Sequence, residues 1–487
     1  MPRSPDSPSL LRTLLLTLLT LGVLAPAPGE AQVWPEPDWT AVEEETLRHF
    51  QALLRLDTSN PPGNETLAAE YLREVLEAEG IPSRILALEP ERGNLVARVG
   101  GNGSREPLLL MGHTDVVTVI PERWEFPPFD AVRHDGYIYG RGALDDKDNV
   151  VASLMMLLLL HRMEVPLDRD IIFLAEAGEE GTTRVGIDFM VQEHWGEIAS
   201  EFCLAEGGGV VLRGGEPVLA TIGTLEKIPR TVELIARGPS GHGSVPLPGN
   251  AIARLARAVA AMAEWDPEPR LNETTQEYFR RMAEMSAPEE AERFRAVSSG
   301  DPNALQEALA WFRENAPAYA SQLQTSVSPT ILEGGDRMNV IPSEARAVLD
   351  IRALPDEDPD QLLDLIRSVV DDPGVEVRFA PRDGMQRPAG GTSIDTDAFR
   401  AIEEAVTRHY GTVSLPTMST GATDMAQVRS MGVDCYGIGP AVDAEDQGLG
   451  YGAHGDQERI LEAELHRFVR FYWDVVLEIA GSRAGTR

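Results

Sequence analysis

Leu108-Leu-Leu-Met-Gly-His113-Thr-Asp115 is a strand-like apolar run that delivers an imidazole and a carboxylate two residues apart. A second loop, Gly140-Arg-Gly-Ala-Leu-Asp145-Asp-Lys147, supplies another carboxylate, and a third supplies the adjacent acids Glu179 and Glu180. Imidazole and carboxylate together are the ligand types that suit Zn²⁺ in a hydrolytic site. Because side chains at the ends of several strands can converge, these motifs predict a metal-dependent hydrolase.

The order of apolar segments predicts the fold class. Strands alternate with helices up to about residue 223, which indicates an α/β layer with a largely parallel sheet. The character changes at about 224, and the α/β pattern resumes after about 384. We therefore expect one discontinuous catalytic domain, formed by residues 33–223 and 384–487, with an α+β domain inserted at 224–383.

Hydrophobic periodicity gives the expected elements. The expected strands are 83–88, 94–99, 107–112, 137–139, 170–175, 202–205, 231–237, 338–352 and 375–380. The expected helices are 42–56, 64–80, 149–162, 183–195, 250–264, 358–371, 395–410 and 456–480, and the stretch 267–325 is expected to be wholly helical.

The N-terminus has the pattern of a secretory signal. Arg3 and Arg12 precede the apolar stretch 14–24, which is too short to span a bilayer, and small residues follow at 25–31. We expect residues 1–31 to be removed and the protein to be exported, to the periplasm or out of the cell. A retained membrane anchor is the alternative.

Composition excludes some partners. A net charge of −35 disfavours binding to nucleic-acid phosphates or to anionic membrane surfaces, and is typical of a soluble protein. The two cysteines, Cys203 and Cys435, could pair in an oxidising compartment. Their apolar, strand-like surroundings favour buried free thiols instead.

Taken together, the motifs resemble the metallopeptidase family of acetylornithine deacetylase, succinyl-diaminopimelate desuccinylase, aminoacylases and carboxypeptidases. The resemblance extends from roughly Leu47 to Val475. It implies a zinc-exopeptidase-like catalytic domain with an inserted lid or dimerisation domain. The segments most like the carboxypeptidase S branch are Asp57-Thr-Ser-Asn-Pro-Pro-Gly-Asn-Glu65, Trp124-Glu-Phe-Pro-Pro-Phe129 and Gly136-Tyr-Ile-Tyr-Gly-Arg-Gly142.

The resemblance also implies a metal-ligand set. His113 and Glu206 would hold one ion, Glu180 and His454 the other, and Asp145 would bridge them, with a cis peptide bond after Asp145. Two divalent ions are expected, with Zn²⁺ favoured and Co²⁺ or Mn²⁺ as alternatives. Such a pair activates a water and polarises the scissile carbonyl.

Three further residues are expected to act in catalysis. Asp115 is suited to orienting the imidazole of His113, and Glu179 is the expected general base. His242, in Gly238-Pro-Ser-Gly-His242, would stabilise the oxyanion from a partner subunit, which implies a homodimer. This sequence departs from the family at Gly178, where an Asp commonly precedes the two Glu residues.

Substrate contacts are expected from Asn339, Arg352 and Gly421. Arg352 would bind the carboxylate of the substrate through two parallel hydrogen bonds. A salt bridge at the end of a strand is the structural alternative for this residue. Only two lysines occur, and one of them, Lys147, is expected to be a supporting charge beside Asp145.

The predicted function is hydrolysis of an amide bond next to a free carboxylate, in small peptides or N-acyl amino acids. A narrow deacetylase or desuccinylase of one metabolite is the first alternative. The second is a non-catalytic metal- or peptide-binding protein of the same fold. The presence of Glu179 favours an enzyme over that second alternative.

Overall fold

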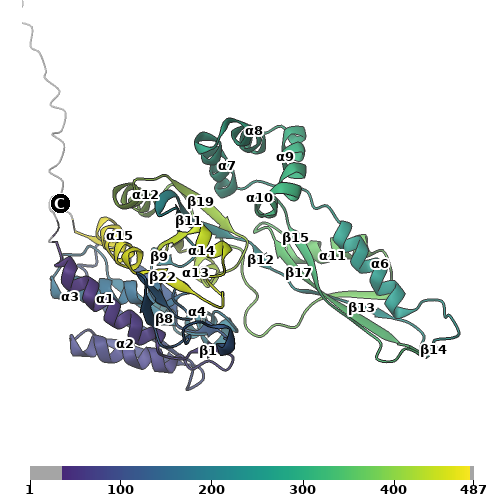
Figure 1. Cartoon of the computed structure of the whole chain (residues 1–487), viewed down its shortest axis with the longest axis horizontal. Helices are drawn as coiled ribbons and strands as arrows, with labels where there is room; N and C mark the ends of the chain where they lie inside the picture. The colour runs from purple at the N-terminus through teal and green to yellow at the C-terminus, as the bar shows by residue number, and fades with distance from the viewer. Residues whose placement is uncertain (1–33, 35, 483–487) are drawn as a thin grey trace, which may run out of the picture. The chain divides into compact units, whose positions relative to one another are not determined.

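A ten-stranded mixed sheet forms the centre of the catalytic part (Figure 1). The structure is a computed structural model that describes residues 34 and 36–482, so the expected signal segment lies outside the described residues. The strands occur in the order β2 (Ser83–Ala87), β3 (Gly93–Val99), β8 (Ile171–Glu176), β4 (Leu108–His113), β9 (Phe202–Ala205), β20 (Asp434–Gly437), β11 (Glu216–Glu226), β10 (Gly209–Arg213) and β21 (Ala441–Asp443), and β19 (Ser414–Ser419) pairs with β11. The neighbours β8, β4, β9 and β20 are parallel, while β2 and β3 are antiparallel. The expected α/β class is confirmed.

Both faces of the central strands are covered by helices. β4 and β8 are buried at every position, as their continuous apolar sequences require. Alternate residues such as Leu109 pack with Ile187 of α4 (Ile187–Glu193). The opposite face is contacted by α3 (Lys147–Arg162), which packs against α1 (Trp39–Leu54) and α15 (Glu462–Ala480).

The inserted part contains a separate antiparallel sheet. Its strands are β12 (Ile228–Pro229), β17 (Glu344–Ala353), β13 (Val232–Arg237), β18 (Val375–Phe379) and β15 (Ser326–Gly334). The helices α6 (Ala251–Glu264) and α11 (Pro359–Val370) lie against this sheet and share one apolar core with it (Figure 1).

The stretch 267–325 was expected to be wholly helical; residues 267–272 form no helix, and the helices α7 (Glu273–Met285), α8 (Pro288–Ser298), α9 (Pro302–Asn315) and α10 (Pro317–Leu323) follow. Phe279, Phe294 and Phe312 form its core together with Leu415 of β19. These helices therefore pack on a strand of the catalytic sheet, although they lie inside the inserted part of the sequence.

Three expectations about elements were wrong. The expected strand 338–352 is divided into the short β16 (Val340–Ile341) and β17, and β15, which precedes it, was not expected. The expected helix 456–480 begins only at Glu462, because β22 (Arg459–Leu461) pairs first with β7 (Tyr137–Tyr139). The expectations also missed β10, β11 and β19–β21, whose short runs lack a clear period.

Of the other elements, α2 (Thr66–Ala78) and α12 (Asp397–Tyr410) follow predicted helices, and α5 (Trp195–Ile198) overlaps one only at residue 195. No predicted segment covers the short elements α13 (Met425–Arg429), α14 (Ala444–Gly448), β1 (Ser59–Asn60), β5 (Val116–Val117), β6 (Val132–His134) and β14 (Gly241–His242). Cys203 and Cys435 face each other in the register of β9 and β20 as buried free thiols, as expected. Among the described helices, none is long and apolar enough to cross a bilayer.

Candidate metal centre

Three neighbouring parallel strands bring the first candidate ligands together. His113 is the last residue of β4, Glu179 and Glu180 follow β8, and Glu206 follows β9. β4 pairs with both β8 and β9, so these carboxyl ends meet at one edge of the sheet. Ligand sites in α/β sheets form at this edge.

The two remaining ligands come from two loops that are held together by strand pairing and hydrogen bonds. Asp145 precedes α3, and His454 lies in the loop before β22. The pairing of β22 with β7 aligns the two loops. The buried carboxylate of Glu458 then accepts hydrogen bonds from Gly142 N at 3.1 Å and Leu144 N at 2.7 Å. Glu458 was not predicted, because its role depends on a contact between distant loops.

Asp145 lies between the two histidines. Its Oδ1 is 2.9 Å from His113 Nε2 and its Oδ2 is 3.0 Å from His454 Nε2, while His454 Nε2 is 2.8 Å from Glu180 Oε1. The peptide bond between Asp145 and Asp146 is cis, which confirms that implication of the resemblance.

The donor atoms fit a divalent-metal site. Ligand atoms of His113, Asp145 and Glu180 lie within 4.8 Å of one another, and so do those of His113, Glu179 and Glu206. Imidazole nitrogen and carboxylate oxygen are the donors that Zn²⁺ accepts. All five residues expected to bind metal are therefore at one place.

The cluster is rich in buried negative charge. Burial is the main cause that raises the pKa of Glu206 and of Asp424 well above the usual range. At His113 burial acts in the opposite direction, but hydrogen bonds to Asp115 and Asp145 outweigh it and raise the pKa of the imidazole. Crowded buried carboxylates are costly unless a cation neutralises them, which agrees with a metal site.

Asp115 organises the loop that follows β8. Its Oδ1 accepts hydrogen bonds from Gly178 N at 2.9 Å and Glu179 N at 3.1 Å, and its Oδ2 accepts from Glu180 N at 3.1 Å and Asn60 Nδ2 at 2.8 Å. Its main-chain oxygen lies 3.0 Å from His113 Nδ1, closer than its carboxylate at 3.5 Å. Asp115 therefore positions both the imidazole and the Glu179-Glu180 pair.

Gly178 is required by the turn of this loop. Its φ is +85°, and a Cβ placed there would lie 2.4 Å from the carbonyl oxygen of Thr182. Residues other than glycine are strained at such a position. The Asp that is common here in the resembling family would not fit this loop conformation.

Glu179 has a cationic partner that the motifs did not reveal. Its Oε1 accepts a hydrogen bond from Arg387 Nη2 at 3.1 Å. Burial raises the pKa of Glu179 to about 7, against the charges of His113 and Arg387. Arg387 also donates to the main-chain oxygen of Thr423 and lies 3.5 Å from Asp424 Oδ1, so it links Glu179 to the loop that begins at Gly421.

The structure does not bring the expected residues His242, Asn339 and Arg352 to the cluster, whereas Gly421 begins the loop that Arg387 contacts at Thr423. His242 and Asn339 are close together, since β14 pairs with β16 and Gly243 N donates to Asn339 O at 2.7 Å. Arg352 Nε donates to both oxygens of Asp350, at 2.9 and 3.2 Å. Within the part of the chain that the structure describes, none of His242, Asn339 and Arg352 bonds to a residue of the cluster.

Lys147 has a different role from the one expected. Its ammonium donates to the main-chain oxygens of Leu53 at 3.1 Å and Leu56 at 2.9 Å, at the end of α1. The side chain is fully buried there. Lys147 thus satisfies the last carbonyls of a helix and is not an ion-pair partner of Asp145.

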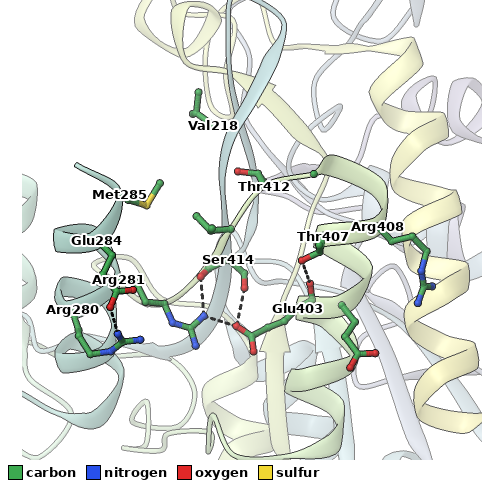
Figure 2. Close-up of a pocket in the computed structure, with 13 residues that line it drawn as sticks. Val218, Arg280, Arg281, Glu284, Met285, Glu403, Thr407, Arg408, Thr412 and Ser414 are labelled. Carbon is green, nitrogen blue, oxygen red and sulfur yellow. Dashed lines mark hydrogen bonds and ion pairs between the residues drawn. The ribbon is translucent and has the colours of Figure 1, made fainter. Parts of the chain in front are cut away.

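A wide cavity of about 1140 Å³ lies apart from the candidate ligands, between α7, α12 and β19 (Figure 2). Arg281 reaches from α7 to Glu403 and to Ser414 O at 2.9 Å, and Arg280 binds Glu284 at 2.5 Å. The charges of Arg280 and Arg281 are therefore neutralised by carboxylates of the protein itself.

The sequence of residues 109–478 matches the family described as Peptidase family M20/M25/M40. The chain belongs to this family, so it is a hydrolase of the peptidase and amidohydrolase type, as expected, in a metal-dependent family.

Two relatives illustrate the range of the family. The human "N-fatty-acyl-amino acid synthase/hydrolase PM20D1" is 28% identical over 452 residues, which cover 89% of this chain and 87% of that protein. The "Probable carboxypeptidase S-like 2" of Dictyostelium discoideum is 28% identical over 388 residues, 77% of this chain and 72% of that protein.

Solved structures confirm the fold. The M20 family metallo-carboxypeptidase Sso-CP2 from Sulfolobus solfataricus aligns with a TM-score of 0.66 at 22% identity, over 89% of this chain and 98% of that one. Human carnosine dipeptidase 1 aligns with a TM-score of 0.63 at 15% identity, over 91% and 99% of the two chains.

Proposed function

We propose that the protein is a two-metal hydrolase that cleaves an amide bond next to a free carboxylate, in small peptides or N-acyl amino acids. The observation that carries the proposal is the placement of Asp145, whose two oxygens lie 2.9 and 3.0 Å from two different histidines. His113 and Glu206 would hold one ion, Glu180 and His454 the other, and Asp145 both. The two metals, with Zn²⁺ favoured, would supply Lewis acidity that activates a water and polarises the scissile carbonyl.

Glu179 serves as the general base in this proposal. It stands next to the ligand Glu180 and within 4.8 Å of ligand atoms of His113 and Glu206. Its carboxylate takes the proton of the attacking water and returns it to the departing nitrogen, which becomes an amine. Arg387 holds one oxygen of that carboxylate, which leaves the other free to accept the proton.

One substitution distinguishes the proposed role of Glu179 as general base from a role in binding the metals. Glu179→Gln keeps the shape of the side chain but cannot accept the proton, so turnover should fall by about 10²–10⁴-fold. The metal content should stay at the wild-type value. The assay uses dipeptides, N-acetyl amino acids and long-chain N-acyl amino acids side by side. Equal turnover in the variant would contradict the assignment of Glu179.

The substrate class is proposed from the relatives. Their printed names describe carboxypeptidase and N-fatty-acyl-amino acid hydrolase activities. A related "Probable succinyl-diaminopimelate desuccinylase" from Staphylococcus aureus, 28% identical over 68% of this chain, supports the narrow-specificity alternative. Turnover of a single member of the substrate panel would favour that alternative.

Export and a homodimer complete the proposal. The sequence pattern of residues 1–31 supports export. His242 would stabilise the oxyanion in the site of a partner subunit, since its imidazole is exposed in this chain and its hydrogen bonds in the described part of the chain are local, to Ser244 Oγ at 2.7 Å and Ser244 N at 3.2 Å.

Mixing two variants tests this intersubunit role. His242→Ala and Glu179→Gln should each be inactive alone, whereas refolding them together should restore about a quarter of the activity through mixed dimers. An inactive mixture whose subunits do exchange would contradict the role of His242.

A further inference from the structure

The two histidines of the candidate metal centre are supported very differently. His113 ends the buried strand β4, and its second ring nitrogen, Nδ1, lies 3.0 Å from the main-chain oxygen of Asp115. His454 lies in an irregular loop, and its side chain is 54% exposed. Among residues 36–482, no hydrogen bond is formed to Nδ1 of His454. Because a ligating histidine is usually oriented through its second nitrogen, the orientation of His454 depends on the conformation of its loop.

The sequence of this loop does not favour one conformation. Glycine occurs at positions 448, 450, 452 and 455, and glycine loses more conformational freedom on folding than any other residue. His454 itself has a φ of +63°, in the left-handed region that is uncommon for residues other than glycine. Such a conformation costs energy and persists only where the surrounding structure fixes it. The loop therefore needs support from outside residues 448–455.

Arg459 supplies this support from β22, the strand that follows the loop. Its guanidinium carbon Cζ lies 3.8 Å from the ring centroid of Tyr451 and 3.8 Å from that of Tyr137. Its Nη2 and Nε donate to the two carboxylate oxygens of Asp446 at 2.5 and 3.2 Å, and its Nη1 donates to Tyr139 Oη at 2.6 Å. Its main-chain N–H donates to the main-chain oxygen of Tyr451 at 3.1 Å.

These contacts join the segments on either side of the loop. Asp446 belongs to α14, which precedes the loop, Tyr451 lies three residues before His454, and the other two tyrosines belong to β7. Cation–π contacts and charge-assisted hydrogen bonds are strongest where water is excluded, and the side chain of Arg459 is only 15% exposed. Arg459 thus holds the loop at both ends, and the Tyr-Ile-Tyr sequence of β7 provides part of its binding surface.

We propose that Arg459 is a positioning residue for the metal ion at Glu180 and His454, and that it controls the affinity for this ion without affecting the ion at His113 and Glu206. The inference rests on the proposed function. Among residues 36–482, Arg459 forms no hydrogen bond or ion pair with a proposed ligand, so it acts through the loop. The other ion depends on ligands at the ends of β4 and β9, which Arg459 does not hold.

The test measures the binding of the two ions separately. The metal-free protein is titrated with Zn²⁺ in competition with a chromophoric chelator, which gives one affinity for each ion. Arg459→Met removes the charge and the hydrogen bonds but keeps a long side chain, and Arg459→Lys keeps the charge. The control is Arg467→Met on α15, because Arg467 also stacks on a tyrosine, Tyr410, at 4.4 Å and pairs with a carboxylate, Glu464, at 3.3 Å.

Arg459→Met should bind the first ion with wild-type affinity and the second about 10–100-fold more weakly, because a group that orients a ligand is lost. Arg459→Lys should lose less, since an ammonium still interacts with the aromatic rings. Turnover of Arg459→Met should be low at limiting Zn²⁺ and recover in excess Zn²⁺, which a damaged fold would not show. The control should match the wild type. Unchanged affinities in Arg459→Met, or an equal loss for both ions, overturn the inference.

Hydrogen exchange tests the positioning role without metal or substrate. The amide protons of Tyr451 and Arg459 are hydrogen-bonded to the main-chain oxygens of Asp446 and Tyr451. In metal-free Arg459→Met they should exchange about tenfold or more faster than in the wild type, while those of β4 should not change. Unchanged exchange at both positions overturns the role of Arg459. A wild type that binds two ions but hydrolyses no amide contradicts the proposed function alone.

Discussion

Glu179 and Arg387 are joined by a hydrogen bond of 3.1 Å, although 208 residues separate them in the sequence. Arg387 is itself buried, and it is anchored on the main-chain oxygen of Thr423. The carboxylate proposed to move the proton is thus fixed by a side chain from the second catalytic segment.

Arg387→Met should lower kcat by about 10–100-fold, because a hydrogen bond to a charged group contributes about 1.5–3 kcal/mol. Metal content and KM should remain close to the wild-type values, since Arg387 contacts none of the five proposed ligands. Arg387→Lys restores the charge without the planar fork, so it should recover part of kcat. The measurement is steady-state kinetics with metal analysis, and an unchanged kcat in Arg387→Met would exclude the positioning role.

The family resemblance implied the ligand positions, and the strand pattern explains why several of these residues meet. His113, Glu180 and Glu206 end or follow neighbouring parallel strands, so a correct sheet brings them together. Arg387 and Glu458 carry no such signal, since they act from irregular segments across long separations. Arg352 forms a salt bridge with Asp350, which was the structural alternative for this residue, and its contact with a substrate stays a prediction.

The errors in the predicted secondary structure also come from contacts between segments that are far apart in the sequence. Residues 456–461 were included in a helix because the apolar period of α15 extends backwards into them, whereas pairing with β7 makes part of them a strand. The helices α7–α10 were predicted correctly, because local periodicity suffices for a helix. Their packing on β19 was not predictable, since it depends on the path of the whole chain.

Asp115 should be essential for stability as well as for activity. Asp115→Ala leaves three main-chain N–H groups of residues 178–180 without their acceptor, and this should cost about 3 kcal/mol or more. Urea unfolding measures the loss, and turnover should disappear with it. The matched control is Asp135→Ala, which removes an acid whose side chain is 84% exposed. A loss as small as that of the control would show that the loop does not depend on Asp115.

Acid should destabilise the fold through His49. Burial lowers the pKa of His49 below its usual value of 6.5, and Nδ1 lies 2.6 Å from Tyr71 Oη. Because the unfolded chain then binds the proton more readily, stability is complete above pH 6.5 and decreases as the pH falls below it.

His49→Gln retains a polar group but does not titrate in this range. Its urea midpoint should therefore decrease less between pH 7 and pH 5 than that of the wild type. The difference between wild type and variant in how far the urea midpoint falls from pH 7 to pH 5 is the contribution of His49, because the other titrating groups are the same in both. An equal or steeper decrease in the variant would contradict the assignment.

Metal stoichiometry tests the central claim most directly, because Asp145 is proposed to serve both ions. The purified chain, after exposure to excess Zn²⁺ and removal of free metal, should contain about two ions per chain, and Asp145→Ala should retain at most about one. The control, Asp135→Ala, should retain the wild-type content. A wild type that binds no zinc, or an Asp145→Ala variant that still binds two ions, would contradict the account.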